Sequence, residues 1–347
     1  MNWKKHVIAA ESSIKEALAQ LDKLAEDALL FVVNKEGELI GSITDGDVRR
    51  GLIKGVSLDA AVVEVAQKNP KFIRKNETDI QKLIDFRNKK LKVIPILNDQ
   101  NNQIVDVINF RLKRSLLNID TVIMAGGKGM RLRPLTDTVP KPLLVVGEKP
   151  IIEHTIDRLA YYGIENIWIS VNYLSEQLED FVRDKPKDLE IEFVKESFPM
   201  GTIGSVSLIE NFKNDYVLIC NSDLLTNLDY EVFFMDFLDF NADLSVVSIP
   251  YNVEVPYAVL EVENGILADF KEKPTYTYFS NGGIYLMKRE ILDFIPKNTD
   301  FSATDLMNKL IEKGLKVRAY PHHGYWLDIG KHDDFQRAQQ DVKLFNF

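Results

Sequence analysis

The sequence predicts two α/β modules, a smaller one over residues 1–117 and a larger one over residues 119–347. Three observations favour this division. In the larger segment, short apolar runs typical of strands alternate with helical patterns, whereas the smaller segment repeats itself at a spacing of about 64 to 66 residues. The charge balance also changes, because residues 1–118 hold 20 Lys and Arg against 16 Asp and Glu, and the remainder holds 23 against 36.

The composition is that of a globular protein in water. Apolar residues make up 45% and charged residues 27% of the 347 residues, which excludes disordered and collagenous chains. The net charge of −9 argues against nucleic-acid binding, and no apolar run approaches the roughly 20 residues that cross a bilayer. The first residues lack the apolar stretch of a secretory signal, so we expect a cytoplasmic protein without a membrane partner.

The smaller module has two halves, about 1–62 and 63–117, with the same order of elements. Helical patterns with hydroxyl caps begin at Ser12 and at Thr78. Each is followed by a strand, a turn and a strand, over residues 29–33, 34–37 and 39–44 in the first half and 93–97, 98–102 and 104–108 in the second. A basic amphipathic helix is expected to close each half, starting at Val48 and at Leu112.

The segment Gly41–Arg50, Gly-Ser-Ile-Thr-Asp-Gly-Asp-Val-Arg-Arg, resembles a CBS domain, and the two halves together resemble a tandem CBS (Bateman) module. The resemblance implies a regulatory nucleotide site with Thr44 and Asp47 on phosphate and ribose, and it favours a homo-oligomer. The alternative for these two residues is a helix N-cap, since capping uses the same geometry. The second half departs from the pattern, with Ile108 and Arg111, or Asn109 and Leu112, at the equivalent positions.

The larger module begins with an apolar strand pattern over 121–125, and a glycine-rich loop follows at once. Three glycines in four positions let backbone N–H groups approach an anion, and nearby Lys and Arg side chains add positive charge. The spacing is that of neither a P-loop nor a dinucleotide-binding loop. The loop therefore predicts a polyphosphate site whose nucleotide-binding residues are Ala125, Gly126, Gly127, Lys128 and Gly129.

This loop continues as Met130-Arg131-Leu132-Arg133-Pro134-Leu135-Thr136, and Pro140-Lys141-Pro142-Leu143-Leu144 comes soon after it. Together the two segments resemble the sugar-1-phosphate nucleotidyltransferases, and the resemblance extends to Phe335. It implies transfer of a nucleotidyl group from a nucleoside triphosphate to a sugar 1-phosphate, with release of pyrophosphate. Arg131 and Lys141 are then the expected catalytic cations, together with the carboxylate of Asp223.

The alternation of elements agrees with a Rossmann-like fold that has a mixed, mostly parallel sheet. Strands are expected at 121–125, 166–171, 190–194, 216–220 and 244–249, and helices at 151–162, 175–183, 203–211 and 230–240. Ligands of such sheets bind beyond the carboxyl ends of the strands. The glycine-rich loop and residues 221–223 should both lie there.

Two carboxylates are candidates for a Mg²⁺ site. Asp223 follows an apolar strand pattern, and Asp328 lies in Trp326-Leu327-Asp328-Ile329-Gly330, which resembles the ending of the same family. Cys220 is the only cysteine, so a cysteine-based zinc site within one chain is excluded and oxygen ligands are expected. The alternative for either Asp is a loop cap.

The sugar-phosphate site is expected from two further segments that resemble family motifs. Phe270-Lys271-Glu272-Lys273-Pro274 offers Glu272 for sugar hydroxyls and Lys273 for the phosphate, and Asn281-Gly282-Gly283 offers Asn281 and Gly283. A solvated charge run is the alternative for residues 271–273.

The loop from Glu196 to Gly204 resembles the family's base-recognition loop, with Gly201 and Thr202 matching it. Guanine presents two adjacent donors that one carboxylate accepts together, so Glu196 favours GTP. The whole architecture resembles the sugar-1-phosphate guanylyltransferases of bacterial legionaminic acid biosynthesis, which implies glucosamine 1-phosphate. Mannose 1-phosphate, a pyrimidine triphosphate, and a non-catalytic nucleotide sensor are the alternatives.

Overall fold

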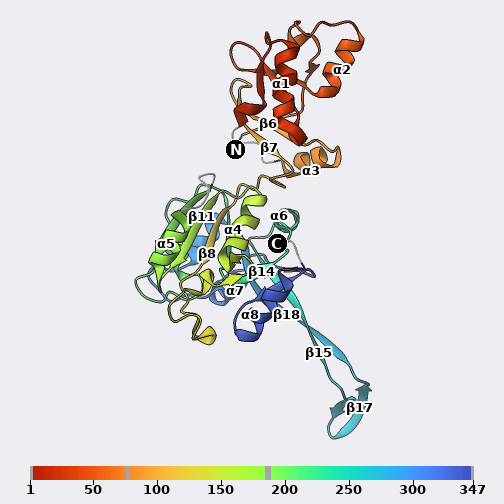
Figure 1. Cartoon of the computed structure of the whole chain (residues 1–347). Coiled ribbons are helices and arrows are strands. Elements are labelled where there is room, and N and C mark those ends of the chain that lie inside the picture. Colours follow the sequence, from red (N-terminus) through yellow and green to blue (C-terminus); the bar gives the residue numbers. More distant parts are fainter. Residues whose placement is uncertain (1–2, 76–78, 184–188, 345–347) are drawn as a thin grey trace. The chain divides into compact units, whose positions relative to one another are not determined.

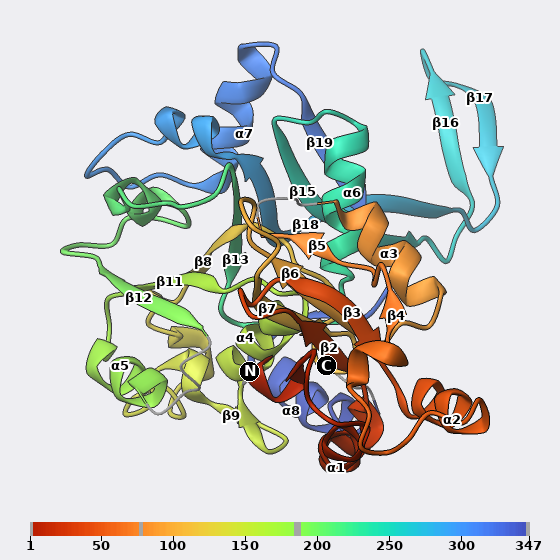
Figure 2. The ribbon, with the colours of Figure 1, turned by 90° about the horizontal axis from the view of Figure 1, so that it is seen from above.

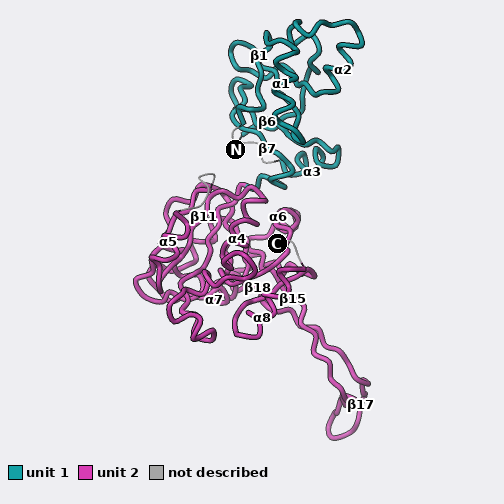
Figure 3. The backbone as a smooth tube through the Cα atoms, viewed as in Figure 1, with its two compact units in different colours: residues 1–117 teal, residues 118–347 magenta. Residues whose placement is uncertain are grey.

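A computed structural model describes residues 3–75, 79–183 and 189–344. The chain forms two compact units, Met1–Leu117 and Asn118–Phe347 (Figure 3). Within the described residues, no helix combines the length and the apolar character that crossing a membrane requires.

The two halves of the first unit have the same order of paired strands. In each half a short strand pairs in parallel with a second strand, which pairs antiparallel with a third. The first half consists of β1 (Val7–Ala9), α1 (Ile14–Leu24), β2 (Leu30–Val33), β3 (Leu39–Ile43) and α2 (Asp45–Ile53), with β4 (Gln67–Lys68) added at the edge of the sheet. The second half consists of β5 (Ile73–Arg74), α3 (Ile80–Asn88), β6 (Val93–Leu97) and β7 (Ile104–Asn109).

The helix expected from Leu112 is wrong. The N–H groups of Leu112 and Lys113 both bond the carbonyl of Asn109 at 2.9 Å, which makes a turn directly after β7. Leu117 and Ile119 are then buried, so the chain is drawn out toward the next strand before a helix can form. Thr78, the expected cap of the second helical pattern, lies outside the described residues, and the side chain of Asp79 caps α3 instead.

The second unit is built on a seven-stranded sheet (Figure 1). All neighbouring strands are parallel except β18, which is antiparallel to both of its neighbours, so the expected mixed, mostly parallel sheet is confirmed. In spatial order the strands are β12 (Glu190–Lys195), β11 (Asn166–Val171), β8 (Asp120–Met124), β13 (Tyr216–Asn221), β18 (Thr275–Lys288), β15 (Leu244–Glu254) and β19 (Val317–Pro321).

Alternate residues of the central strands point to opposite faces of this sheet. Val122 and Ile219 pack in one buried cluster with Leu306 of α7 (Ala303–Glu312). On the other face, Tyr216 contacts the rings of Phe234 and Phe237 from α6 (Tyr230–Asp239).

The remaining helices of this unit are α4 (Ile151–Tyr161), α5 (Ser175–Arg183) and α8 (His332–Asp341). The helix expected over 203–211 is shortened to a 3-10 turn at Gly204–Leu208. Gly204, Ser205 and Ser207 have low helix propensity, which accounts for the difference.

Strands β15 and β18 extend beyond the sheet. Their antiparallel pairing continues from Ile249 and Ser280 to Glu254 and Thr275. The chain between them forms a two-stranded hairpin of β16 (Val259–Glu263) and β17 (Ile266–Lys271). This hairpin stands away from the rest of its unit in both Figure 1 and Figure 2.

Candidate active site

A cavity of about 450 Å³ lies at the edge of the sheet where the parallel strands end. Ala125 follows β8, Glu196 follows β12 and Ser222 follows β13. The ends of three strands therefore form part of the cavity wall. The lining residues are Met124, Ala125, Gly126, Gly127, Gly129, Met130, Arg131, Lys141, Pro142, Glu196, Pro199, Met200, Gly201, Thr202, Asn221, Ser222, Asp223, Asp300 and Gly330.

The pairing of β8 with β13 brings the glycine-rich loop beside Asp223. Met124 and Asn221 are register partners, and the N–H of Ser222 donates to the Met124 carbonyl at 3.1 Å. Beyond this bond the two chains separate around the cavity. Residues 124 and 221 are nearly 100 positions apart in sequence, and the parallel order of the sheet alone makes them neighbours.

The glycine-rich loop combines one packed glycine with one open glycine. Gly129 has a left-handed backbone (φ +60°), and a Cβ there would lie 3.0 to 3.1 Å from Thr136 and Lys141. At Gly127 a Cβ would meet no atom within 4 Å. Because the space beside Gly127 is empty, a ligand can approach its backbone closely. Lys128 is exposed and does not line the cavity.

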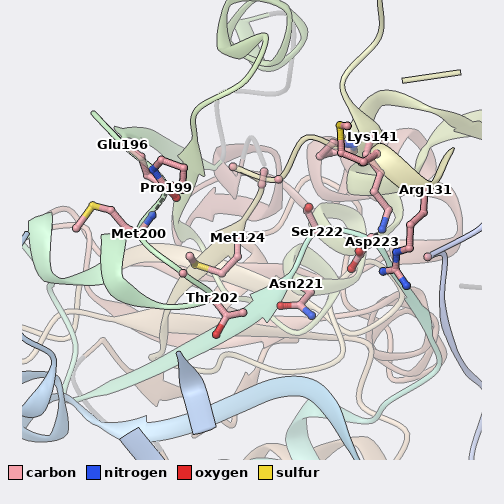
Figure 4. A pocket seen from close by; sticks show the side chains of 18 of the residues that line it. Met124, Arg131, Lys141, Glu196, Pro199, Met200, Thr202, Asn221, Ser222 and Asp223 are labelled. Atoms are coloured by element: carbon pink, nitrogen blue, oxygen red, sulfur yellow. Dashed lines mark hydrogen bonds and ion pairs between the residues drawn. The ribbon is translucent and has the colours of Figure 1, made fainter. Parts of the chain in front are cut away.

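One end of the cavity is charged. Lys141, on a 3-10 turn at Lys141–Leu143, forms an ion pair with Asp223, and both side chains are largely buried. Arg131 lies beside Gly330, where a Cβ would be 3.2 Å from the guanidinium. Figure 4 shows Arg131, Lys141 and Asp223 together at this end and Glu196 at the opposite end.

Asp328 lies behind Asp223 although it does not line the cavity. Strand β14 (Leu224–Thr226) pairs with β20 (Trp326–Asp328), and the Ile329 N–H donates to the Asp223 carbonyl at 3.0 Å. Burial, followed by repulsion from the Asp223 carboxylate, raises the pKa of Asp328, while Lys141 and Arg131 oppose the shift. The two carboxylates therefore repel one another when no cation lies between them.

The two carboxylates fit a divalent cation. Asp223 Oδ1 and Asp328 Oδ1 are both buried and have no hydrogen-bond partner among the described residues. Among all the residues that the structure describes, no group of three or more His, Cys, Asp and Glu residues is arranged as a metal site. Mg²⁺ commonly takes one or two protein carboxylates and completes its shell with substrate phosphates and water. Asp223 at the cavity wall, with Asp328 behind it, matches that pattern.

At the other end, Glu196 is held in place by hydroxyl groups. The Ser170 hydroxyl donates to Glu196 Oε1 at 2.6 Å and lies 2.7 Å from the Ser205 hydroxyl, and the Met200 N–H donates to Oε2 at 3.3 Å. Each carboxylate oxygen keeps a second lone pair for a ligand. A Cβ at Gly126 would lie 2.7 Å from Glu196 Oε1, so a side chain there would displace the carboxylate from this position.

The loop that carries Gly201 and Thr202 is anchored by a distant segment. Gly201 has φ +75°, and a Cβ there would lie 2.5 Å from Asp300 Oδ1 and 2.6 Å from the Phe301 carbonyl. The Thr202 hydroxyl accepts a hydrogen bond from the Ala303 N–H at 2.9 Å. Asp300 thereby reaches the cavity, which sequence reasoning missed, because no motif surrounds it. Met124, Met130, Pro142 and Gly330 also line the cavity without having been named as site residues, and Pro199 and Met200 were expected only as part of the base-recognition loop.

Comparison with known families decides the class of this unit. The family model described as nucleotidyl transferase matches residues 120–343. The chain belongs to the nucleotidyl transferase family. A CBS domain model matches residues 1–54, so a CBS domain lies at the N-terminus. We call the second unit the transferase unit and the first the CBS unit.

Several known proteins are similar in sequence to this chain. A UTP–glucose-1-phosphate uridylyltransferase of Synechocystis is 29% identical over 243 residues, covering 64% of this chain and 62% of that protein. A mannose-1-phosphate guanylyltransferase of Mycobacterium tuberculosis is 29% identical over 237 residues, covering 65% and 64%. The chain thus spans less than two thirds of the length of these relatives. The structure of HddC from Yersinia pseudotuberculosis complexed with GMP-PN is 26% identical with a TM-score of 0.50, covering 65% of this chain and 99% of that one.

The expected sugar-phosphate residues of the transferase unit do not line the cavity. Asn281 and Gly283 lie next to it, since a Cβ on Gly283 would be 2.6 Å from the Asn221 side chain, and Asn281 Oδ1 accepts from the Gly283 N–H at 2.9 Å. Glu272 and Lys273 are exposed beyond the end of β17. The structure therefore brings the nucleotide and metal candidates together and leaves these two outside.

In the CBS unit, Thr44 and Asp47 make a capping box at the start of α2. Thr44 Oγ1 lies 2.6 Å from Asp47 Oδ2, and Arg50 and Gln67 also bond the Asp47 carboxylate. Burial raises the pKa of Asp47, but hydrogen bonds from Thr44 and Gln67 outweigh it, so that the net pKa is lowered. These contacts match the N-cap alternative, and a nucleotide role for the pair stays a prediction. Neither residue lines the cavity of about 560 Å³ that Phe72, Arg74 and Lys82 help to form.

Proposed function

We propose that the transferase unit transfers a guanylyl group from GTP to a sugar 1-phosphate, glucosamine 1-phosphate, giving a GDP-sugar and pyrophosphate. One observation carries the proposal. A single cavity has a hydrogen-bond acceptor, Glu196, at one end and the cations Arg131 and Lys141 with Asp223 at the other, joined by a glycine-rich loop. This order matches base, phosphates and metal along a nucleoside triphosphate.

The reaction needs positioning and charge neutralisation. An oxygen of the sugar phosphate attacks the α-phosphorus, the new P–O bond forms, and the bond from the α-phosphorus to the bridging oxygen breaks, leaving pyrophosphate with the electron pair. No general base is required, because the attacking phosphate is already an anion. Arg131 and Lys141 stabilise the charge that builds on the phosphates, and Lys141 exchanges Asp223 for a phosphate oxygen when substrate binds.

Mg²⁺ is the cofactor that this proposal requires. Asp223 and Asp328 would hold it, and when bound it neutralises phosphate charge and orients the triphosphate. The unsatisfied Oδ1 atoms of the two residues support this assignment.

The choice of GTP rests on Glu196. Its carboxylate can accept from the adjacent N1–H and N2–H of guanine, whereas uracil and thymine present acceptors on both sides of a single donor. The GMP-PN complex of HddC and the name of the mycobacterial relative agree with this choice. Glucosamine 1-phosphate rests on the resemblance to the guanylyltransferases of legionaminic acid biosynthesis, and mannose 1-phosphate is the second candidate.

Pyrophosphate release with a panel of substrates tests the function. The full chain is incubated with Mg²⁺, each of GTP, UTP, dTTP and CTP, and glucosamine, glucose or mannose 1-phosphate. We expect the highest turnover with GTP and glucosamine 1-phosphate. Equal or better turnover with a pyrimidine contradicts the argument from Glu196. Binding of GTP without release of pyrophosphate from any pair indicates a sensor.

We further propose that the CBS unit binds a nucleotide or nucleotide-sugar and changes the rate of the transferase unit. Titration calorimetry on the full chain and on Asp47→Ala tests this. Coupling must be reciprocal, so occupancy of the transferase cavity should change the affinity of the CBS ligand. Unchanged binding after Asp47→Ala would remove this residue from the ligand site.

A further inference from the structure

The segment of residues 250–281, called the arm below, is a folded element with almost no core. It comprises the outer parts of β15 and β18 and the hairpin β16–β17. Every residue from Leu260 to Lys273 is exposed, and no residue of the arm lines the cavity. Figures 1 and 2 show its tip standing away from the sheet.

The arm has one apolar face. Directly opposed residues of an antiparallel pair share a face, and Leu260 opposes Phe270 while Val262 opposes Leu267. These four side chains are 55% to 59% exposed. Closer to the sheet, Tyr251 opposes Tyr278, at 62% and 60% exposed.

The opposite face of the hairpin is charged, with Glu261 opposed to Asp269 and Lys271 in an ion pair with Glu261 at 2.7 Å. A two-stranded hairpin is marginally stable in water unless something packs against it. One face of the arm is therefore chemically suited to a protein partner, and its own chain does not cover it.

The base of the arm is fixed. The Trp326 indole N–H donates to the Gly282 carbonyl at 2.9 Å, and Gly283 is packed against Asn221. From Ile249 to Glu254 the pairing with β18 runs without a register shift. Lys273 precedes β18, and the stretch of β18 from Thr275 to Asn281 corresponds to about 20 Å of strand. Glu272 and Lys273 cannot reach their own cavity unless this ladder breaks.

The rim of the cavity offers a matching surface. Met130 and Phe198 are 55% and 39% exposed beside it. Lys128 and Arg131 add positive charge near the glycine-rich loop, whereas Glu196, Asp223 and Asp300 line the same cavity. The arm carries more acidic than basic residues, and it contains Glu272 and Lys273, the pair expected at a sugar phosphate. A partner that needs these two residues at a nucleotide cavity is a second copy of this chain.

We propose that two copies exchange arms, so that the arm of each lies across the transferase cavity of the other and supplies Glu272 and Lys273 to its sugar-phosphate site. Exchange in both directions gives a closed two-fold dimer. The role of Glu272 and Lys273 in this inference rests on the proposed function, whereas the exchange itself rests on the exposed apolar face and the fixed base.

Mixing two inactive variants tests the exchange. Glu272→Ala/Lys273→Ala damages only the arm, and Asp223→Asn damages only the cavity. After the two proteins are mixed at equal concentrations and subunits re-equilibrate, half of the dimers are mixed, and each has one site with an intact cavity and an intact arm. We expect turnover to return to about a quarter of the wild-type value. No recovery, with wild type active, overturns the proposal, since an arm serving its own cavity leaves every site damaged.

A second measurement does not depend on turnover. Full-length ¹⁵N-labelled and unlabelled wild-type chains are mixed, treated with an amine crosslinker and digested. We expect crosslinks from Lys271 and Lys273 to Lys128 that join one labelled and one unlabelled peptide. Such crosslinks without turnover would uphold the exchange and reject the proposed function. Crosslinks that join only peptides of the same isotope overturn the exchange.

Discussion

The carboxylate of Glu196 is held in place by a chain of hydroxyls. Ser205 and Ser170 orient its Oε1, and Met200 binds its Oε2, before any ligand arrives. A preorganised acceptor loses little entropy when a base binds to it.

Glu196→Gln should therefore change base preference. The amide places a donor opposite a guanine donor, so kcat/KM with GTP should fall about 10- to 100-fold, or about 1.5 to 3 kcal/mol, with a smaller change for UTP. Pyrophosphate release measures both values. Glu192→Gln is the control. Glu192 is an exposed residue of β12, the strand that Glu196 follows, and its substitution should leave both kcat/KM values unchanged. An equal loss with GTP and UTP would show that Glu196 does not recognise the base.

Asp223→Asn tests the metal site. The amide keeps a hydrogen bond to Lys141 but removes a charge, so turnover should fall at least about 100-fold at saturating Mg²⁺. The melting temperature, followed by circular dichroism, should change little. Asp215→Asn is the matched control, because Asp215 lies just before the opposite end of β13 and is mostly exposed. Full activity of Asp223→Asn would remove this residue from the metal site.

At the scale of elements, the close packing of the loop around Gly201 requires a residue without a Cβ at this position. Backbone groups of residues 301 and 303, which lie far from the loop in the sequence, hold it in place through hydrogen bonds. A tight approach of this kind leaves no room for even one methyl group.

Gly201→Ala should lower the free energy of unfolding of the transferase unit by about 2 to 4 kcal/mol, because it adds a clash with the Phe301 carbonyl to the left-handed strain. Gly314→Ala is the matched control. Gly314 has φ +72° with nothing within 4 Å, so only the strain, about 1 kcal/mol, should appear. Urea unfolding of both variants measures the difference. Equal losses would mean that the close approach at Gly201 relaxes freely.

Patterns within single elements predicted most of the elements, and contacts between distant segments account for the rest. The strand expected at 166–171 and the helix expected at 175–183 have these bounds, since apolar spacing is a local property. The absent helix after Leu112 reflects the burial of Leu117 and Ile119, which no local pattern shows. The extension of β15 to Glu254 was also missed, because exposed Tyr251 and Val253 do not look like the end of a core strand.

At the scale of the whole molecule, the motifs predicted which segments belong to one site. They did not predict how far apart the fold of a single chain places those segments. The segments around Gly126, Lys141, Glu196 and Asp223 line one cavity, because the ends of parallel strands share an edge. Glu272 and Lys273, which were expected at the sugar phosphate, lie outside this cavity within one chain. A sequence motif does not show whether its residues act in the site of their own chain or in the site of a second copy.

Both units hold a buried histidine that opposes folding in acid. Burial lowers the pKa of His6 in the CBS unit and that of His322 in the transferase unit below the ordinary 6.5. The unfolded chain then binds more protons than the folded chain below pH 6.5, so stability is complete above that pH and is lost as the pH falls.

Thermal unfolding between pH 5 and pH 8 should show this loss. Each histidine contributes up to about 1.4 kcal/mol for each pH unit between 6.5 and its lowered pKa. His6→Asn keeps a side-chain donor for the Leu29 carbonyl, which His6 Nδ1 bonds at 3.0 Å, and cannot titrate. The CBS unit of this variant should therefore unfold with a weaker pH dependence. His323→Asn, on a side chain that is exposed, is the control.

The reactivity of the single thiol of the chain can report on the opening of the strand that precedes Asp223. Cys220 is 1% exposed near the carboxyl end of β13, and burial raises its pKa to about 12. Alkylating reagents attack the thiolate, so labelling requires the strand to open. The CBS unit has no cysteine and gives no signal. The labelling rate of the native protein therefore counts opening events beside Asp223 alone, and each substrate that ties β13 to the glycine-rich loop should slow it.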